Sequence, residues 1–126
     1  LAASLAELAG QSLPKGSCLD SFNVLDALLG RDGAAGRDHL VQQDNGTNGT
    51  YALRTAEWKL HRYDRKRARN VTVERQLANT PVPEFQLFHL VDDPAESQNV
   101  AAEHPKIAAQ LRKQLAGIIQ DGRSRP

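Results

Sequence analysis

The sequence predicts an α+β protein, in which a four-stranded antiparallel sheet packs against a long C-terminal helix and short helices come first. Two observations predict this class. Four short extended stretches with alternating apolar side chains follow one another between residues 39 and 90, and strands joined directly in chain order pair antiparallel. Apolar side chains then recur at helical spacing over residues 105–120, which is typical of an amphipathic helix that covers one face of a sheet.

The overall composition fits one globular domain and excludes some functions. The chain has 126 residues, of which 40% are apolar and 25% charged, with a net charge of +1, and this balance carries no strong signature of nucleic-acid or membrane binding. No run of roughly 18 apolar residues predicts a transmembrane helix, and residues 1–10 do not resemble a signal peptide. Because the chain begins with Leu1 rather than Met, we expect a portion of a longer protein.

The N-terminal third of the sequence predicts two short helices. Leucines at helical spacing predict a first helix that ends at Gly10. A second helix is expected to begin after a cap at Asp20 or Ser21 and to end at Gly30. The apolar side of this second helix is expected to consist of Phe22, Leu25, Leu28 and Leu29.

The sheet is expected from four extended runs separated by turn signals. The runs are residues 39–43, 51–55, 58–63 and 84–90. Two Asn-Gly pairs within residues 44–50 favour a reversal between the first two runs, and Thr55-Ala56-Glu57 is short enough for a tight hairpin turn. The last helix begins at Pro105, since proline suits the first helical position, and its stripe is Ile107, Leu111, Leu115, Ile118 and Ile119.

The junction "LFHLVDDPAESQNVAAEHP" leads from the fourth strand to the last helix. Pro94 prevents further sheet pairing, so we interpret the junction as a structural crossover. Metal binding by Asp92, Asp93 and Glu96 is the chemical alternative, but further oxygen ligands do not recur at the spacing of a calcium loop.

Other metal-ligating or nucleophilic residue types give no pattern. The four histidines show no zinc spacing, and we interpret them as surface or sheet residues. They are His39, His61, His89 and His104. Cys18 has only Lys15 nearby to lower its pKa, so we interpret it as a buried or unreactive thiol.

A basic connector, residues 64–83, separates the third and fourth runs. One interpretation is a solvated connector. The other is a loop that contacts anions, because guanidinium groups bind sulfate, phosphate or carboxylate in a bidentate manner. The cations concerned are Arg62, Arg65, Lys66, Arg67, Arg69 and Arg75.

Four stretches in order resemble the C-terminal portion of arylsulfatase-type sulfatases. They are "LAELAGQSLP", "SFNVLDALLG", "YALRTAEWKL" and "FQLFHLVDDPAESQNVAAEHP", and together they cover nearly the whole chain. The third resembles the Arg-x-Gly-x-Trp-Lys-Leu hairpin of the family. The fourth resembles its Glu-Leu-Tyr-Asp-Leu, Asp-Pro-x-Glu, Asn-Leu-Ala block. Ala56 stands where the family usually has glycine, Phe88-His89 replaces Tyr-Asp, and the connector is longer than in many members.

The resemblance implies an alkaline-phosphatase-like sulfuric ester hydrolase whose chemistry lies outside this portion. A formylglycine, made within a Cys-x-Pro-x-Arg type motif, and a calcium ion belong to the N-terminal catalytic domain of the family. Cys18 is followed by Leu-Asp-Ser, so we expect no catalytic residue, metal or cofactor here and no activity of this portion alone. Residues 1–36 would connect to that domain, and residues 37–126 would form the C-terminal antiparallel-sheet subdomain.

The resemblance also implies partners, a substrate and a location. The partners would be the catalytic domain of the same chain and a sulfate ester substrate, with no nucleic acid or membrane. Loops of the small sheet would form one wall of the substrate cleft. The rim candidates are Arg65, Lys66, Arg67, Arg69, Asn45 and Asn48. A periplasmic or secreted location is favoured.

Two other functions are open at this stage. The basic connector favours a freestanding module that binds an anionic polymer, either RNA or a sulfated glycan. An interaction domain with an exposed apolar surface is the other.

Overall fold

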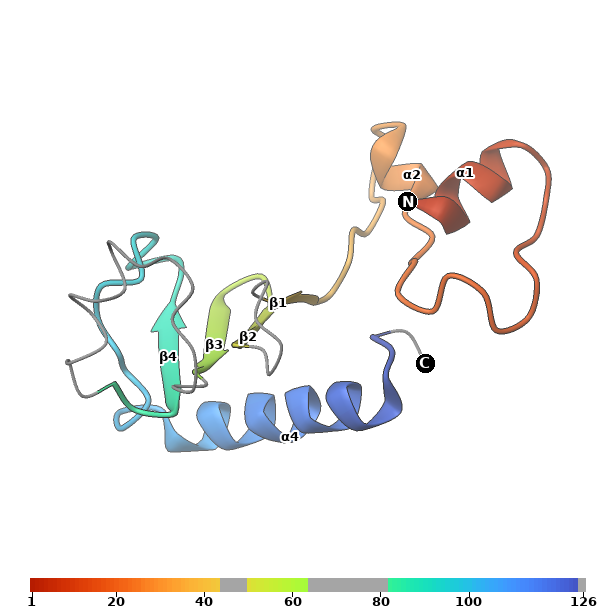
Figure 1. Cartoon of the computed structure of the whole chain (residues 1–126). Helices are drawn as coiled ribbons and strands as arrows, with labels where there is room; N and C mark the ends of the chain where they lie inside the picture. The colour runs from red at the N-terminus through yellow and green to blue at the C-terminus, as the bar shows by residue number, and fades with distance from the viewer. Residues whose placement is uncertain (44–49, 64–81, 125–126) are drawn as a thin grey trace, which may run out of the picture. The chain divides into compact units, whose positions relative to one another are not determined.

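The computed structural model describes residues 1–43, 50–63 and 82–124, and Figure 1 shows their trace. The observed order of elements is that of an α+β fold, which confirms the predicted class. The elements are α1 (Ala2–Leu8), α2 (Leu25–Leu28), β1 (Leu40–Gln43), β2 (Tyr51–Arg54), β3 (Trp58–Arg62), β4 (Phe85–His89) and α4 (Pro105–Asp121).

Contacts within the chain divide it into two compact units. The helical unit contains Leu1–Asp38 and the chain from Gly117 onward. The sheet unit spans His39–Ala116 and holds all four strands with most of α4.

The sheet is a meander in which each strand pairs with the next along the chain. Its order is β1-β2-β3-β4, and all three pairings are antiparallel. The registers bring Val41, Leu53, Leu60 and Leu87 opposite one another across the four strands. Since opposed residues share a face, these four side chains form one apolar row.

The hairpin between β2 and β3 closes without glycine. Outside glycine, the described residues adopt a left-handed backbone only at Cys18 and Glu96, so Ala56 and Glu57 turn the chain with ordinary φ angles. Thr55 supports this turn, because its backbone N–H donates to the carbonyl of Trp58 at 2.8 Å and its hydroxyl accepts from the Trp58 N–H at 3.1 Å. The turn therefore tolerates Ala56 where the resembling sulfatases usually have glycine.

The core of the sheet unit lies between this apolar row and α4. Leu53, Leu60 and Leu87 are completely buried. On α4 the buried residues are Ala108, Leu111 and Leu115. The guanidinium of Arg112 lies 4.0 Å from the ring centre of Phe85. Because Phe85 shares a face with Leu87, α4 covers the face that carries the apolar row, as the sequence predicts.

In the helical unit, hydroxyl groups join α1 to the segment before α2, whose Leu25 is buried. Ser4 is completely buried, and its Oγ accepts the backbone N–H of Val24 at 2.9 Å. Ser21 Oγ accepts the N–H of Ala3 at 2.8 Å. These two bonds join α1 to the segment that leads into α2.

The predicted cap of α2 is wrong. The helix begins one turn later than expected, at Leu25, and Asn23 Oδ1 accepts the Leu25 N–H. Ser21 binds α1 instead, and Asp20 Oδ1 accepts both the backbone N–H and the hydroxyl of Ser124, at 2.7 and 2.8 Å. The Ser124 backbone N–H and hydroxyl, helped by the charge of Arg37, lower the pKa of Asp20 below its usual range.

Within the described residues, every helix is too short or too polar to cross a bilayer.

We predict that Leu60→Ala lowers the free energy of unfolding by about 2–5 kcal/mol, because it leaves a cavity in a closely packed core. Urea denaturation of the chain measures this loss. Val91→Ala is the matched control, since Val91 is 66% exposed, and it should change the value by less than about 0.5 kcal/mol. Equal losses for the two variants would contradict the assigned core.

Candidate functional site

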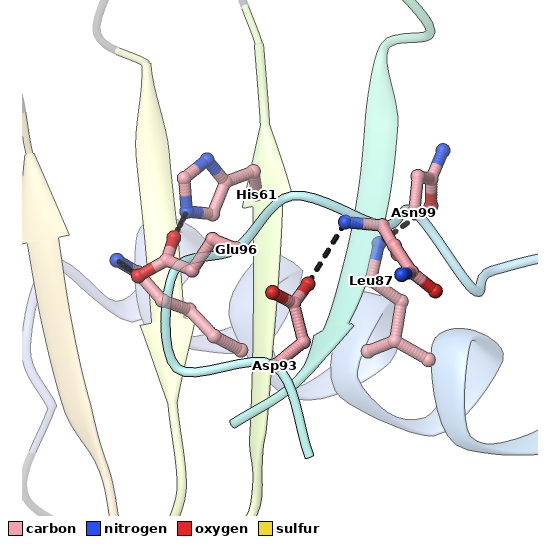
Figure 2. Close-up of polar contacts among 7 residues, drawn as sticks. His61, Leu87, Asp93, Glu96 and Asn99 are labelled. Carbon is pink, nitrogen blue, oxygen red and sulfur yellow. Dashed lines mark hydrogen bonds and ion pairs between the residues drawn. The ribbon is translucent and has the colours of Figure 1, made fainter. Parts of the chain in front are cut away.

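The chain after β4 folds back across the sheet, and we call residues 92–100 the return loop. In Figure 2 this loop crosses in front of the strands while α4 lies behind them. Lys59 and His61 flank Leu60 in β3 and therefore point away from α4. The return loop thus occupies the sheet face opposite to α4, where the polar side chains of β3 emerge.

Glu96 joins the return loop to β3. Its two carboxylate oxygens lie 2.6 Å from Lys59 Nζ and 3.0 Å from His61 Nε2 (Figure 2). All three side chains are at least 70% buried, since their exposed fractions are 15% for Lys59, 26% for Glu96 and 29% for His61. Glu96 has a φ of 56°, a conformation that costs about 1–3 kcal/mol for a residue other than glycine. The Lys59–Glu96 ion pair helps to offset this strain.

His61 lies in a site that disfavours its charged form. Its ring meets Phe88 edge-on with centroids 5.2 Å apart. Its Nε2 is buried, and the angle to Glu96 is not that of a well-formed hydrogen bond. Burial, and then the charge of Lys59, lower the pKa of His61 below its ordinary value of 6.5, although Glu96 opposes both.

Asp93 closes the turn at the start of the return loop. Its carboxylate accepts the hydroxyl of Ser97 at 2.9 Å and the backbone N–H of Gln98 at 2.8 Å. Hydrogen bonds from the Ser97 and Gln98 backbones and from the Ser97 hydroxyl lower the pKa of Asp93. This carboxylate acts as a local turn cap.

Asn99 and Val100 cover the outer edge of β4. Asn99 Oδ1 accepts the N–H of Leu87 at 3.0 Å, and the Val100 N–H donates to the Leu87 carbonyl at 2.8 Å. An edge strand leaves alternate backbone groups unpaired and prone to pairing with another chain. The return loop satisfies these groups at the most buried residue of β4.

Three rings gather where β3 begins and β4 ends. The Trp58 ring centre lies 4.4 Å from that of His89 and 4.9 Å from that of His104. Asp92 Oδ2 lies 2.6 Å from His89 Nδ1. The interaction fixes the orientation of the His89 ring beside Trp58.

Asp92, Asp93 and Glu96, the acidic residues considered for metal binding, do not lie together in the structure. Asp92, Asp93 and Glu96 each contact a different partner: His89, the Ser97–Gln98 turn and the Lys59–His61 pair. Their carboxylates do not converge, and the described ranges 1–43, 50–63 and 82–124 hold no group of three His, Cys, Asp or Glu side chains placed to bind a metal. Cys18 is exposed rather than buried.

The predicted rim residues lie outside the described residues. Asn45 and Asn48 fall within residues 44–49, and Arg65, Lys66, Arg67 and Arg69 fall within residues 64–81. Sequence reasoning missed Lys59, His61 and Asn99, because their partners lie 12 to 37 positions away. The polar residues in the "DDPAESQN" stretch were the available signal.

No protein-family model matches the chain. The chain is 35% identical, over 92% of its length, to an N-acetylgalactosamine-6-O-sulfatase of Bacteroides thetaiotaomicron, and 31% identical, over 94%, to human arylsulfatase G. It spans only 22% and 23% of the length of these two relatives.

Two solved structures share the fold. One comes from work on glycosaminoglycan metabolism by Bacteroides thetaiotaomicron and superposes on 92% of the chain with a TM-score of 0.75 and 34% identity. The other is described as a complex with its substrate D-glucosamine-2-N,6-O-disulfate. It has a TM-score of 0.61 at 17% identity and covers 95% of the chain. The chain covers 23% and 24% of these structures.

The fold is that of the small sheet-and-helix portion of a hydrolase. The chain belongs to the sulfatase family, and it matches the C-terminal portion of arylsulfatase-type members. The catalytic domain of these relatives lies in the part that the match does not cover. The return loop, whose residues belong to one of the stretches that resemble sulfatases, holds the chain against the sheet through Glu96, Asn99 and Val100.

We predict that Asn99→Ala lowers the free energy of unfolding by about 1–2 kcal/mol, because the N–H of Leu87 loses its acceptor. Denaturant titration measures the change. Gln98→Ala is the control, since Gln98 takes part in the loop through its backbone N–H and should shift stability by less than about 0.5 kcal/mol. A neutral Asn99→Ala would show that the edge of β4 does not need this cover.

We predict that His61 makes the fold less stable as pH falls below about 6.5. Between its lowered pKa in the folded state and that value, the unfolded chain binds the proton more readily, so stability is complete above this window and declines through it. Urea denaturation at about pH 7.5 and about pH 5.5 measures the loss. His61→Gln should reduce this loss of stability, whereas Val91→Ala, at an exposed residue without a titratable group, should leave the loss unchanged. An equal loss in the His61→Gln variant would contradict this assignment.

Proposed function

We propose that the chain serves as the C-terminal subdomain of a sulfuric ester hydrolase and packs beside the catalytic domain of the same polypeptide. Residues 1–36 form the connecting segment, and residues 37–126 form the sheet subdomain. The observation that carries the proposal is the match to sulfatases over 92% of the chain at 35% identity. The shared fold of the solved structures supports it.

In this proposal the reactive groups are supplied from outside the chain. Calcium and a formylglycine are the groups that the family would use, and the residues present do not fit them. Cys18 is followed by Leu-Asp-Ser, and the described residues offer no three-ligand metal cluster. The chain contributes a rigid sheet whose loops border the substrate cleft. The sulfatase relatives favour a secreted or periplasmic protein.

The substrate class we propose is a sulfated sugar. One relative is named for a sulfated amino sugar, and one solved relative is described with a disulfated glucosamine as its substrate. A sulfated sugar is anionic, and arginine binds sulfate oxygens through paired N–H donors. Arg65, Lys66, Arg67 and Arg69 are the cationic rim we propose, with Asn45 and Asn48 as neutral donors.

Because the proposal places the reactive groups outside this chain, we predict that the 126-residue chain releases no sulfate from an aryl sulfate or a 6-O-sulfated amino sugar. The full-length polypeptide, in which this portion follows a catalytic domain, should release it. Sulfate release measured by ion chromatography distinguishes the two. Turnover by the isolated chain, or none by the full-length polypeptide with any sulfated sugar or aryl sulfate, would contradict the proposal.

The cationic rim predicts a substrate-dependent loss of affinity. Changing Arg65, Lys66, Arg67 and Arg69 together to glutamine in the full-length polypeptide should raise KM for a multiply sulfated oligosaccharide by roughly tenfold or more, because each charge-assisted bond contributes about 1.5–3 kcal/mol. KM for a small aryl sulfate should change little. Lys106→Gln with Lys113→Gln on α4 is the charge control. Equal changes for both substrates would remove the rim from the proposal.

A further inference from the structure

Helix α1 exposes its leucines and buries a serine. Leu5 and Leu8 are 52% and 60% exposed, whereas Ser4 is completely buried. A helix on the surface of a globular domain normally turns its apolar stripe toward the core and its polar side chains to water. The orientation of α1 is the reverse.

The C-terminal end of α2 exposes leucines as well, although Leu25 at its start is buried. Leu28 and Leu29, at the end of α2, are 56% and 51% exposed, and α1 contacts α2 within the helical unit (Figure 1). We call Leu5, Leu8, Leu28 and Leu29 the leucine surface. Because α1 and α2 contact each other, these four leucines leave apolar area exposed on one small helical unit, which favours contact with another part of the polypeptide.

The inverted orientation is fixed by hydrogen bonds inside the unit. Ser4 and Ser21 accept backbone N–H groups of Val24 and Ala3, and the amide of Asn23 donates to the Glu7 carboxylate at 2.6 Å. Rotating α1 to hide its leucines would break all three interactions. The leucine surface therefore stays outward unless something outside this unit covers it.

The relatives indicate what that cover is. The chain corresponds to 22% and 23% of the length of its two curated relatives and matches their C-terminal portion. More than three quarters of each relative therefore lies outside the C-terminal portion that this chain matches. Elements that follow one another in a chain usually lie next to one another in space, and α1 is the first element of this portion.

We propose that the leucine surface is the docking face for the catalytic domain of a sulfatase-type polypeptide. The inference rests on the proposed function and adds to it which side chains make the contact. The partner surface it fits is apolar, because the exposed side chains that it would meet are those of four leucines.

Hydroxyl-radical footprinting with mass spectrometry tests this proposal, because it labels exposed leucine side chains directly. The labelling of Leu5 and Leu8 is compared between the 126-residue chain and the full-length polypeptide. We expect labelling of both leucines to be several-fold slower in the full-length polypeptide. Val91, which is exposed in the sheet unit, provides the internal control and should be labelled equally in both.

Three results would overturn the proposal. Equal labelling of the leucines in the two proteins would show that the catalytic domain does not cover them. Protection in the isolated chain that rises with concentration would identify a second copy as the occupant. Protection in the isolated chain at every concentration would show that the chain itself covers them.

A pair of substitutions and an activity assay separate this proposal from the proposed function. Leu5→Asp with Leu8→Asp should lower the Tm of the full-length polypeptide and leave that of the 126-residue chain nearly unchanged, and Val91→Asp should spare both. An equal loss in both proteins would contradict docking. Sulfate release with unprotected leucines would refute the docking face alone, whereas protected leucines without sulfatase activity would refute the proposed function alone.

Discussion

The side-by-side packing of Leu53, Leu60 and Leu87 is the interaction on which the rest of the sheet unit depends. These side chains come from three adjacent strands, lie in one register and are completely buried. Moving any strand by one residue would turn its leucine to the opposite face. The row therefore fixes the register of the sheet. It also forms the apolar surface against which Ala108, Leu111 and Leu115 of α4 pack.

The return loop depends on this register, because its partners are defined by it. Lys59 and His61 reach Glu96 only while Leu60 points toward α4, and Leu87 offers its backbone to Asn99 and Val100 on the free edge of β4. The sulfatase-like spacing of Asp93, Glu96 and Asn99 thus has a physical explanation. Asp93 closes the turn with two hydrogen bonds, Glu96 contacts two side chains of β3, and Asn99 accepts the N–H of Leu87, so all three help to fold the chain back over the sheet.

Local patterns predicted the elements well, and long-range contacts account for what they missed. The strands and α4 differ from their predicted bounds by a residue or so, because side-chain periodicity determines them. The cap of α2 was wrong, because Ser21 and Asp20 bond to Ala3 and Ser124, 18 and 104 positions away. The Lys59–Glu96 pair and the outward leucines of α1 depend on tertiary contacts that sequence spacing does not contain, and the rim candidates lie in segments outside the described residues.

Amide hydrogen exchange on the 126-residue chain tests the central claim most directly. The claim is that the return loop is an integral part of the folded sheet. It predicts that the amides of Leu87 and Val100 exchange as slowly as those of Leu53 and Leu60 in the interior of the sheet. Exchange of Val100 at the rate of an unfolded peptide, while Leu53 and Leu60 remain protected, would contradict it.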